Sequence, residues 1–208
     1  MLLVGVISST TAIHASILVF VAALAEEIAG LTTTQVSFVL SIAAIFEITT
    51  AASSGLVFDL NTVRSHRLPA FSLCGLTCGF ALLALTFCSE INSFALIYIV
   101  LVMLIWVIYG QHATCISDIL KNVNVPGGFA INRCLNGIAA MLLPLLAGQI
   151  KDRINSFQYA FTVLALLQIL LSLAFFISLF INRVKICCCA RGNRNNADEN
   201  EDRSQKSC

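Results

Sequence analysis

Charged residues are scarce in this sequence. Only 11% of its 208 residues are Asp, Glu, Lys or Arg, whereas an ordinary soluble domain has about 25%. Hydrophobic residues make up 58%, which is more apolar surface than a small soluble fold can bury. The formal net charge of +1 gives no indication of a nucleic-acid partner. The composition therefore excludes an ordinary soluble domain and predicts a protein whose solvent is lipid.

Motifs that would indicate an enzyme are also missing. The sequence contains no H-E-x-x-H, G-x-S-x-G or Walker pattern. The main enzymatic alternative for a membrane protein of six spans is an intramembrane protease, and the sequence lacks the motifs of such an enzyme. We expect no enzymatic activity, no cofactor, no metal ion and no nucleic-acid partner.

Long apolar runs are what the sequence has instead. Six of them approach or exceed the ~20 residues that a helix needs to cross about 30 Å of hydrocarbon. They are Leu3–Ala25, Gln35–Val57, Pro69–Cys88, Phe94–Ile116, Phe129–Ile150 and Gln158–Ile181. We expect an all-α membrane domain of six transmembrane helices over residues 1–183. The polar residues 184–208 cannot bury enough area to become ordered, and they predict a disordered cytosolic tail.

Basic residues predict the orientation of the spans. The even connections and the tail hold Arg64, Arg67, Lys121, Arg183, Lys185, Arg191, Arg194, Arg203 and Lys206. The opposite side holds only Lys151 and Arg153. By the positive-inside rule both termini are cytosolic, in a multi-pass protein that we expect in the plasma membrane. In the fourth connection, residues 118–127, we expect Pro126-Gly127-Gly128 to act as a breaker.

Two of the predicted spans end alike. The second ends in Gly55 with Asp59 four residues later, and the fifth in Gly148 with Asp152 four residues later. The two endings fall on opposite sides of the membrane, as an inverted three-plus-three helix repeat requires. Gly allows close helix approach, and the acid can meet a basic loop residue; Arg64 belongs to the same candidate gating motif. Coincidence is the alternative, because Gly and Asp are common at helix ends.

Several short motifs occur in an order that matches a known family. The first group is Ala25-Glu26-Glu27, Gly30-Leu31-Thr32, Gln35, Phe38-Val39-Leu40-Ser41-Ile42 and Gly55-Leu56. The second group is Ser117-Asp118, Leu143-Pro144-Leu145-Leu146-Ala147-Gly148 with Asp152, and Tyr159-Ala160-Phe161. Over about residues 15–183 the chain resembles helices seven to twelve of monocarboxylate transporters, which belong to the major facilitator superfamily.

The resemblance implies half of a major-facilitator fold in a carrier that works by alternating access. The first, second, fourth and fifth spans would face the solute path, and the third and sixth would face lipid. The chain would be a truncated or partial carrier that does not transport alone. Its expected partners are a missing N-terminal half or another six-helix unit, the lipid bilayer, and a small-molecule solute moved by symport with a proton. The alternative is a six-span scaffold or accessory protein without carrier activity.

Ionisable residues inside the spans are the candidate transport residues, because burying them in a membrane is costly. Glu47 and His14 each lie about 17 Å from a helix end at ~1.5 Å per residue, which places both near the midplane. A carboxylate and an imidazole at one depth could share a proton. The alternative is a protonated Glu47 that is hydrogen-bonded to Thr50 or to a backbone carbonyl.

The fifth span adds polar residues to the same candidate path. Asn132, Arg133 and Asn136 lie in it, and Arg133, about one turn from its start, is expected to reach the cytosolic interface. Family members that carry small monocarboxylates place an Asp, and an Arg four residues later, in helix eight. Here these positions hold Glu47 and Ala51. Because the cation is missing, a neutral substrate is the simpler expectation.

Nine cysteines would predict disulfides in a short secreted chain. Five of them fall in or beside apolar segments, where we expect reduced thiols that act as small hydrophobic side chains. Cys187, Cys188 and Cys189 directly follow the last span among basic residues, which predicts palmitoylation beside anionic lipid. Three adjacent cysteines lack the ligand spacing of a metal site.

Overall fold

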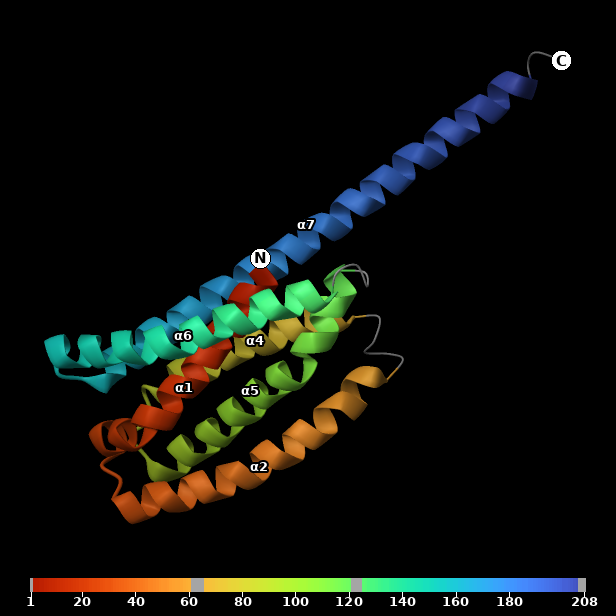
Figure 1. Cartoon of the computed structure of the whole chain (residues 1–208). Coiled ribbons are helices and arrows are strands. Elements are labelled where there is room, and N and C mark those ends of the chain that lie inside the picture. Colours follow the sequence, from red (N-terminus) through yellow and green to blue (C-terminus); the bar gives the residue numbers. More distant parts are fainter. Residues whose placement is uncertain (1, 61–65, 121–124, 206–208) are drawn as a thin grey trace.

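The protein is a bundle of six helices in a computed structural model that describes residues 2–60, 66–120 and 125–205 (Figure 1). Side chains are described for 3–58, 60, 66–120 and 125–181, and the described residues form no strand. The helices are α1 (Leu2–Ala29), α2 (Thr33–Asp59), α4 (Arg67–Leu85), α5 (Ile91–Leu120), α6 (Val125–Ile154) and α7 (Phe157–Gln205). Each contains a stretch long and apolar enough to cross a membrane, so the prediction of six spans in a multi-pass membrane protein is confirmed.

The connection between α1 and α2 is short because its residues end one helix and begin the next. Gly30 has a φ of +60°, a left-handed conformation that glycine adopts at little cost. Thr32 caps α2 by accepting a hydrogen bond from the backbone N–H of Gln35. The Gln35 side chain in turn accepts one from the backbone N–H of Thr32 at 3.0 Å, which completes a capping box.

The connection between α5 and α6 is shorter than predicted. Residues 118–127 were expected to form it, but α5 continues to Leu120 and α6 begins at Val125. Pro126 lies in the first turn of α6, where the backbone N–H groups have no intrahelical partner. The proline therefore loses no hydrogen bond, and the expectation that it breaks the helix is wrong.

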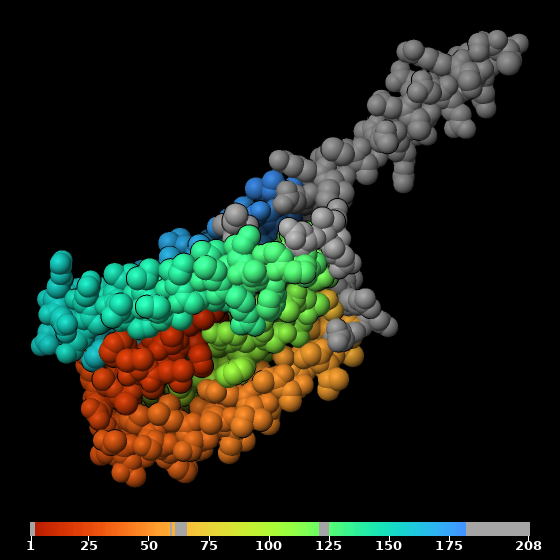
Figure 2. Space-filling view, in the orientation of Figure 1, coloured from red at the N-terminus to blue at the C-terminus, as the bar shows by residue number. Residues whose placement is uncertain are grey.

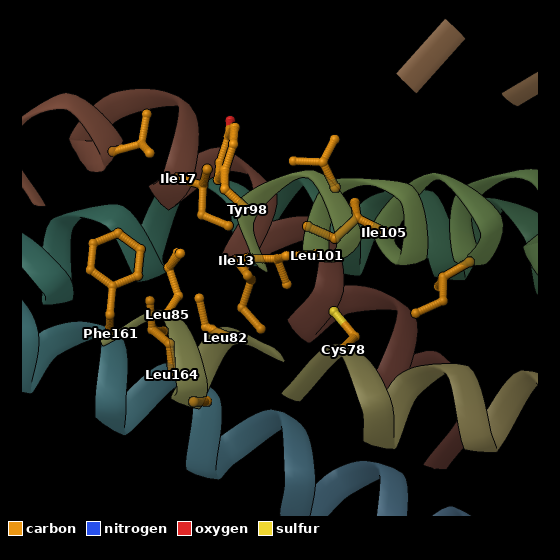
Figure 3. Packing of buried hydrophobic residues seen from close by; sticks show 14 of the residues in the cluster. Ile13, Ile17, Cys78, Leu82, Leu85, Tyr98, Leu101, Ile105, Phe161 and Leu164 are labelled. Atoms are coloured by element: carbon orange, nitrogen blue, oxygen red, sulfur yellow. The ribbon is translucent and has the colours of Figure 1, made fainter. Parts of the chain in front are cut away.

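Each of the six helices packs against at least two others. The most extensive contacts join α4 with α7, α1 with α6, α2 with α5, α4 with α5, and α1 with α7. In the space-filling view, α2 and α6 lie on the outside with parts of α1 and α5 between them (Figure 2). The core combines side chains of α1, α4, α5 and α7, such as Ile13, Leu82, Leu101 and Phe161 (Figure 3).

The α7 helix continues through the polar tail. Its membrane-spanning part is Phe157–Ile181, and the helix then runs to Gln205. The side chains from 182 onward lie outside the described residues, so the expected disorder of the tail stays a prediction. The same holds for acylation of Cys187, Cys188 and Cys189.

Two glycines bring α4 and α7 into close contact. A Cβ atom at Gly75 would lie 2.6 Å from Ser172 Oγ, and one at Gly79 would lie 2.6 Å from Ile169 Cγ1 and 3.1 Å from Ile169 N. A buried glutamine adds polar contacts beside this seam. Gln168 accepts a hydrogen bond from Ser9 of α1, and its amide donates to Thr10 Oγ1 at 3.0 Å and to the Gly75 carbonyl at 3.5 Å. The α1, α4 and α7 helices are thus held together inside the membrane.

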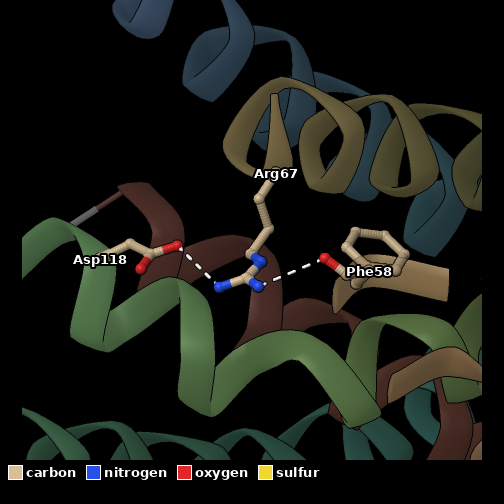
Figure 4. Close-up of polar contacts among 3 residues, drawn as sticks. All are labelled: Phe58, Arg67 and Asp118. Carbon is tan, nitrogen blue, oxygen red and sulfur yellow. Dashed lines mark hydrogen bonds and ion pairs between the residues drawn. The ribbon is translucent and has the colours of Figure 1, made fainter. Parts of the chain in front are cut away.

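A buried arginine connects three helix ends. Arg67, at the start of α4, donates to Asp118 of α5 at 3.3 Å and to the carbonyl oxygen of Phe58 of α2 at 3.3 Å (Figure 4). Its side chain is 7% exposed, whereas that of Asp118 is 40% exposed. A guanidinium can bind a carboxylate and a helix-end carbonyl together because its donors point in fixed directions.

Replacing Arg67 by methionine is expected to lower the free energy of unfolding by about 2–4 kcal/mol. Methionine keeps much of the apolar stem but removes hydrogen bonds to a charged group and to a helix end. The matched control is Lys151→Met, because the Lys151–Asp152 pair is 4.0 Å apart and more exposed. We expect the control to cost less than about 1 kcal/mol. Unfolding in mixed micelles measures the free energy of unfolding of both variants. Equal losses would contradict a stabilising role of the Arg67 hydrogen bonds.

Candidate functional site

Two predicted site residues come together from different helices. His14 lies near the middle of α1 and Glu47 near the middle of α2. Both side chains are half-buried, and the charge of Glu47 is close enough to act on His14 and on Tyr98 of α5. No hydrogen bond between His14 and Glu47 is present among the described residues. An acid and an imidazole near the middles of α1 and α2 are therefore within electrostatic reach of each other.

His14 also packs against two aromatic rings of α5. Its ring centroid lies 5.9 Å from that of Trp106 and 5.8 Å from that of Tyr109, in edge-to-face geometry. The centroids of Trp106 and Tyr109 lie 5.7 Å apart. Three rings at nearly equal separations form a compact unit, the aromatic triad His14–Trp106–Tyr109. Edge-to-face contacts of this kind stabilise each other by about 0.5–1.5 kcal/mol per pair.

The alternative for Glu47 was a hydrogen bond to Thr50 or to a backbone carbonyl; the bond to Thr50 is not formed among the described residues, and the bond to a carbonyl stays a prediction. Thr50 Oγ1 is buried and has no hydrogen-bond partner among the described residues. Thr50 lies on the same helix as Glu47, three residues later.

The predicted asparagines of α6 face α1. Asn136 Oδ1 accepts a hydrogen bond from Ser8 of α1 at 2.8 Å. Asn132, one turn earlier, is fully buried, yet neither atom of its side-chain amide has a partner within the described residues. A buried amide without partners costs about 1–3 kcal/mol for each unmet group. Asn132 is therefore a buried polar group whose hydrogen bonds the described neighbours do not supply.

Arg133 lies deeper in its helix than predicted. It comes eight residues after Val125, about two turns rather than one, because the proline that was expected to precede the helix lies inside it. Its guanidinium carbon lies 4.9 Å from the centroid of the Phe129 ring, and that ring stacks on His112 at 5.4 Å. The charge of Arg133 acts on Tyr109 and His112 of α5. Arg133 thus belongs to the side of the site nearer to the start of α6.

The two Gly-x-x-x-Asp endings differ in their surroundings. A Cβ atom at Gly55 would meet nothing within 4 Å, whereas one at Gly148 would make an ordinary contact with Phe20 at 3.8 Å. The expected close helix approach is therefore not made at Gly55. The Asp152 carboxylate lies 4.0 Å from Lys151. The side chain of Asp59 and the whole of Arg64 lie outside the described residues, so their gating role stays a prediction.

Sequence reasoning missed the aromatic half of the site. Trp106 and Tyr109 lie in a strongly apolar span, where they were counted as hydrophobic residues. A signal was available, because tryptophan in membrane proteins is enriched at the interfaces. Trp106, the only tryptophan of the chain, lies instead at the middle of α5. A tryptophan at that depth needs a partner for its indole N–H.

The five cysteines whose side chains the structure describes offer no further site. Cys74, Cys78, Cys88, Cys115 and Cys134 are free thiols. Cys88, in the turn between α4 and α5, has a thiol whose pKa is raised by burial, so it is a poor nucleophile. Among the residues that the structure describes, no group of three His, Cys, Asp or Glu side chains could hold a metal ion.

An apolar cavity of about 570 Å³ lies apart from the polar cluster. Residues from the start of α1, the end of α5, the start of α6 and α7 line it, among them Leu3, Ile116, Gly128 and Phe175. Ser178 is the polar side chain in this lining. A cavity with one hydroxyl and no ionisable group does not suit a polar solute, so the cluster around His14 remains the candidate site.

Comparison with known proteins assigns no family to the chain. No protein-family model matches the chain, and no curated protein is found to be similar to it.

Proposed function

We propose that the chain forms one six-helix half of a secondary solute carrier of major-facilitator, monocarboxylate-transporter type. The observation that carries the proposal is a set of polar side chains inside apolar helices, with His14 and Glu47 near the middles of α1 and α2 and Arg133 about two turns into α6. His14, Glu47, Tyr109 and Arg133 come from four different helices, α1, α2, α5 and α6. Ionisable side chains at this depth face protein or water and mark solute or proton pathways.

The pattern of helix contacts supports an inverted repeat. Exchanging α1 with α5, α2 with α6 and α4 with α7 maps the first three helices onto the last three, which run in the opposite direction. Under this exchange the α1–α6 contact becomes the α5–α2 contact, the α4–α5 contact becomes the α7–α1 contact, and the α4–α7 contact maps onto itself. These are the five most extensive contacts in the bundle. Repeats of this kind place the solute site near the midplane.

The surroundings of α6 support a missing partner. Among the six spans α6 has the lowest mean hydropathy and is also the least buried inside the chain. The α5 and α7 helices share the highest mean hydropathy of the six spans. We infer that another six-helix unit, with the solute path between them, covers α6 and the polar faces of α1, α2 and α5. A scaffold without a path gives no reason for ionisable groups on these faces.

The test of this proposal is whether water reaches the cluster. Thr11, beside Tyr109, and Leu170, 64% exposed on α7, lie at similar depths. In a background without native cysteines, Thr11→Cys is expected to react with a charged thiol reagent, because thiolates form in water. Leu170→Cys, which faces lipid, should not react. Mass spectrometry of the labelled chain measures both, and an inert thiol at position 11 would overturn the carrier proposal.

A further inference from the structure

The apolar cavity of about 570 Å³ has a buried floor and an exposed rim. Leu3 of α1, Ile116 of α5 and Phe175 of α7 form the floor, and each of them is at most 5% exposed. Ile119 of α5 and Ile131 of α6 form the rim and are 42% and 55% exposed. The cavity is thus open at the surface of the bundle and reaches into its core. Its volume is typical of ligand pockets, which often lie between the helices of bundles.

The cavity lies at one end of the membrane-spanning helices. Its lining comes from the first turn of α1, the last turns of α5, the first turns of α6 and the last turns of the membrane-spanning part of α7. Every lining residue falls inside a segment that is long and apolar enough to cross a membrane. The rim of the cavity therefore opens to the hydrocarbon of the bilayer, close to the level at which the headgroups begin.

The lining of the cavity selects an apolar occupant. Apart from Ser178, its side chains carry no hydroxyl, amide or charged group. An apolar cavity stays dry and takes up apolar molecules instead. A cavity that is left empty destabilises a fold in proportion to its volume. The apolar molecule that surrounds the helices at this depth is the acyl chain of a membrane lipid, so the lining and its surroundings point to the same occupant.

Ser178 adds one hydrogen-bonding group to the lining. A serine or threonine in a membrane helix can donate to the carbonyl oxygen one turn earlier, as Thr162 of the same helix does to Gln158 at 2.8 Å. Ser178 makes no hydrogen bond within the part of the chain that the structure describes. It lies three residues before Ile181, where the membrane-spanning part of α7 ends, which is about 4.5 Å along the helix. The ester groups of phospholipids lie at this depth, between hydrocarbon and headgroups.

We propose that the cavity binds one ester-linked acyl chain of a membrane phospholipid, and that the hydroxyl of Ser178 donates a hydrogen bond to the carbonyl oxygen of that ester. The acyl chain enters past Ile119 and Ile131 and covers the buried floor, while the headgroup stays at the membrane surface. The bound lipid then connects α1, α5, α6 and α7 at one end of the bundle. No residue of the cluster around His14 takes part, so this lipid site does not depend on the carrier proposal.

The test compares an ester-linked phospholipid with its ether-linked analogue. The delipidated chain in detergent micelles is titrated with diacyl phosphatidylcholine and with dialkyl phosphatidylcholine, which lacks the carbonyl oxygen, and native mass spectrometry counts the bound lipids. We expect one diacyl lipid to bind saturably. The dialkyl lipid should bind about two- to tenfold more weakly, as expected for the loss of one hydrogen bond between neutral groups. No saturable binding of one diacyl lipid, or equal affinity for the two lipids, overturns the proposal.

Three variants make the result specific to the cavity. Ser178→Ala should lower the affinity for the diacyl lipid by the same factor and leave the affinity for the dialkyl lipid unchanged, a difference that a merely structural role does not produce. Ser178→Phe fills the cavity and is expected to abolish saturable binding of both lipids. Leu170→Phe, at a residue of α7 that is 64% exposed and lies outside the cavity, should bind as the native chain does. Undiminished binding by Ser178→Phe overturns the proposal.

A photoreactive phospholipid locates the bound chain directly. With the reactive group in the part of the acyl chain next to the ester, we expect cross-linked peptides that contain Ile116 or Phe175 of the cavity floor. Leu142 of α6 and Leu170 of α7 are exposed residues outside the cavity. Cross-links spread evenly over such positions would show only the lipid that surrounds any membrane protein, and would overturn the proposal.

Discussion

Replacing Glu47 by glutamine is expected to remove the pH dependence of solute uptake by the assembled carrier, while membrane insertion stays normal. Glutamine keeps the shape of the side chain but cannot take up a proton. The groups on which the charge of Glu47 acts are His14 of α1 and Tyr98 of α5. Coupling between two ligands typically amounts to about 1–3 kcal/mol, so pH-driven uptake should fall roughly 5- to 150-fold. Uptake of labelled solute at acidic and alkaline external pH measures the loss.

Two further variants decide between a proton carrier and a structural acid. Glu47→Asp should keep part of the pH dependence, because the shorter side chain still titrates. Glu90→Gln changes a carboxylate in the turn between α4 and α5 and should leave the pH profile as it is. If uptake and its pH profile both survive in Glu47→Gln, the hydrogen-bonding shape of the side chain is all that matters, and Glu47 is not the proton site.

Gly79→Leu is expected to prevent stable packing of α4 on α7. A leucine Cβ would already lie 2.6 Å from Ile169 Cγ1 and 3.1 Å from the Ile169 backbone nitrogen. Ile169 Cγ1 could move with its side chain, but the backbone nitrogen cannot move without shifting α7. Overpacking of a well-packed contact costs about 1–3 kcal/mol and occasionally more. We expect about 3 kcal/mol or more here, measured as a lower midpoint of thermal unfolding in detergent.

The matched control is the same substitution at another helical glycine. Gly137 of α6 lies on an exposed face, and a Cβ atom there would meet nothing within 4 Å. Gly137→Leu should therefore be neutral or slightly stabilising, since leucine has the higher helix propensity. A similar drop in both variants would mean that leucine is harmful for a reason other than the α4–α7 contact.

The six spans could be predicted from the sequence because each is a local property. Length and apolar content decide whether a helix can cross the bilayer, and both can be counted along the chain. The placement of Glu47 and His14 at one depth follows from the same count. The error at the start of α6 arose because Pro126 was expected to break the helix. A proline in the first turn of a helix has no hydrogen bond to lose, and the local sequence does not say which turn it occupies.

The rest of the site depends on contacts between helices. That Trp106 and Tyr109 meet His14, and that Thr50 does not bind Glu47, depends on how α1, α2 and α5 are rotated about their axes. Apolar spans do not show such rotation in their sequence, because lipid and protein neighbours are both apolar. Asn132 shows the same limit. Its position in α6 was known from the sequence, but its complete burial without partners became visible only in the packed bundle.

The buried amide of Gln168 has a consequence for biosynthesis. Because the chain is made from its N-terminus, α7 leaves the ribosome after the other five described helices, and it carries the Gln168 amide at the middle of its membrane-spanning part. The groups that this amide bonds, Ser9, Thr10 and the Gly75 carbonyl, belong to α1 and α4, which have been inserted by then. Docking of α7 therefore completes these hydrogen bonds and covers Gly75 and Gly79 in one step. A nascent chain that stops before α7 would leave Gly75 and Gly79 of α4 uncovered.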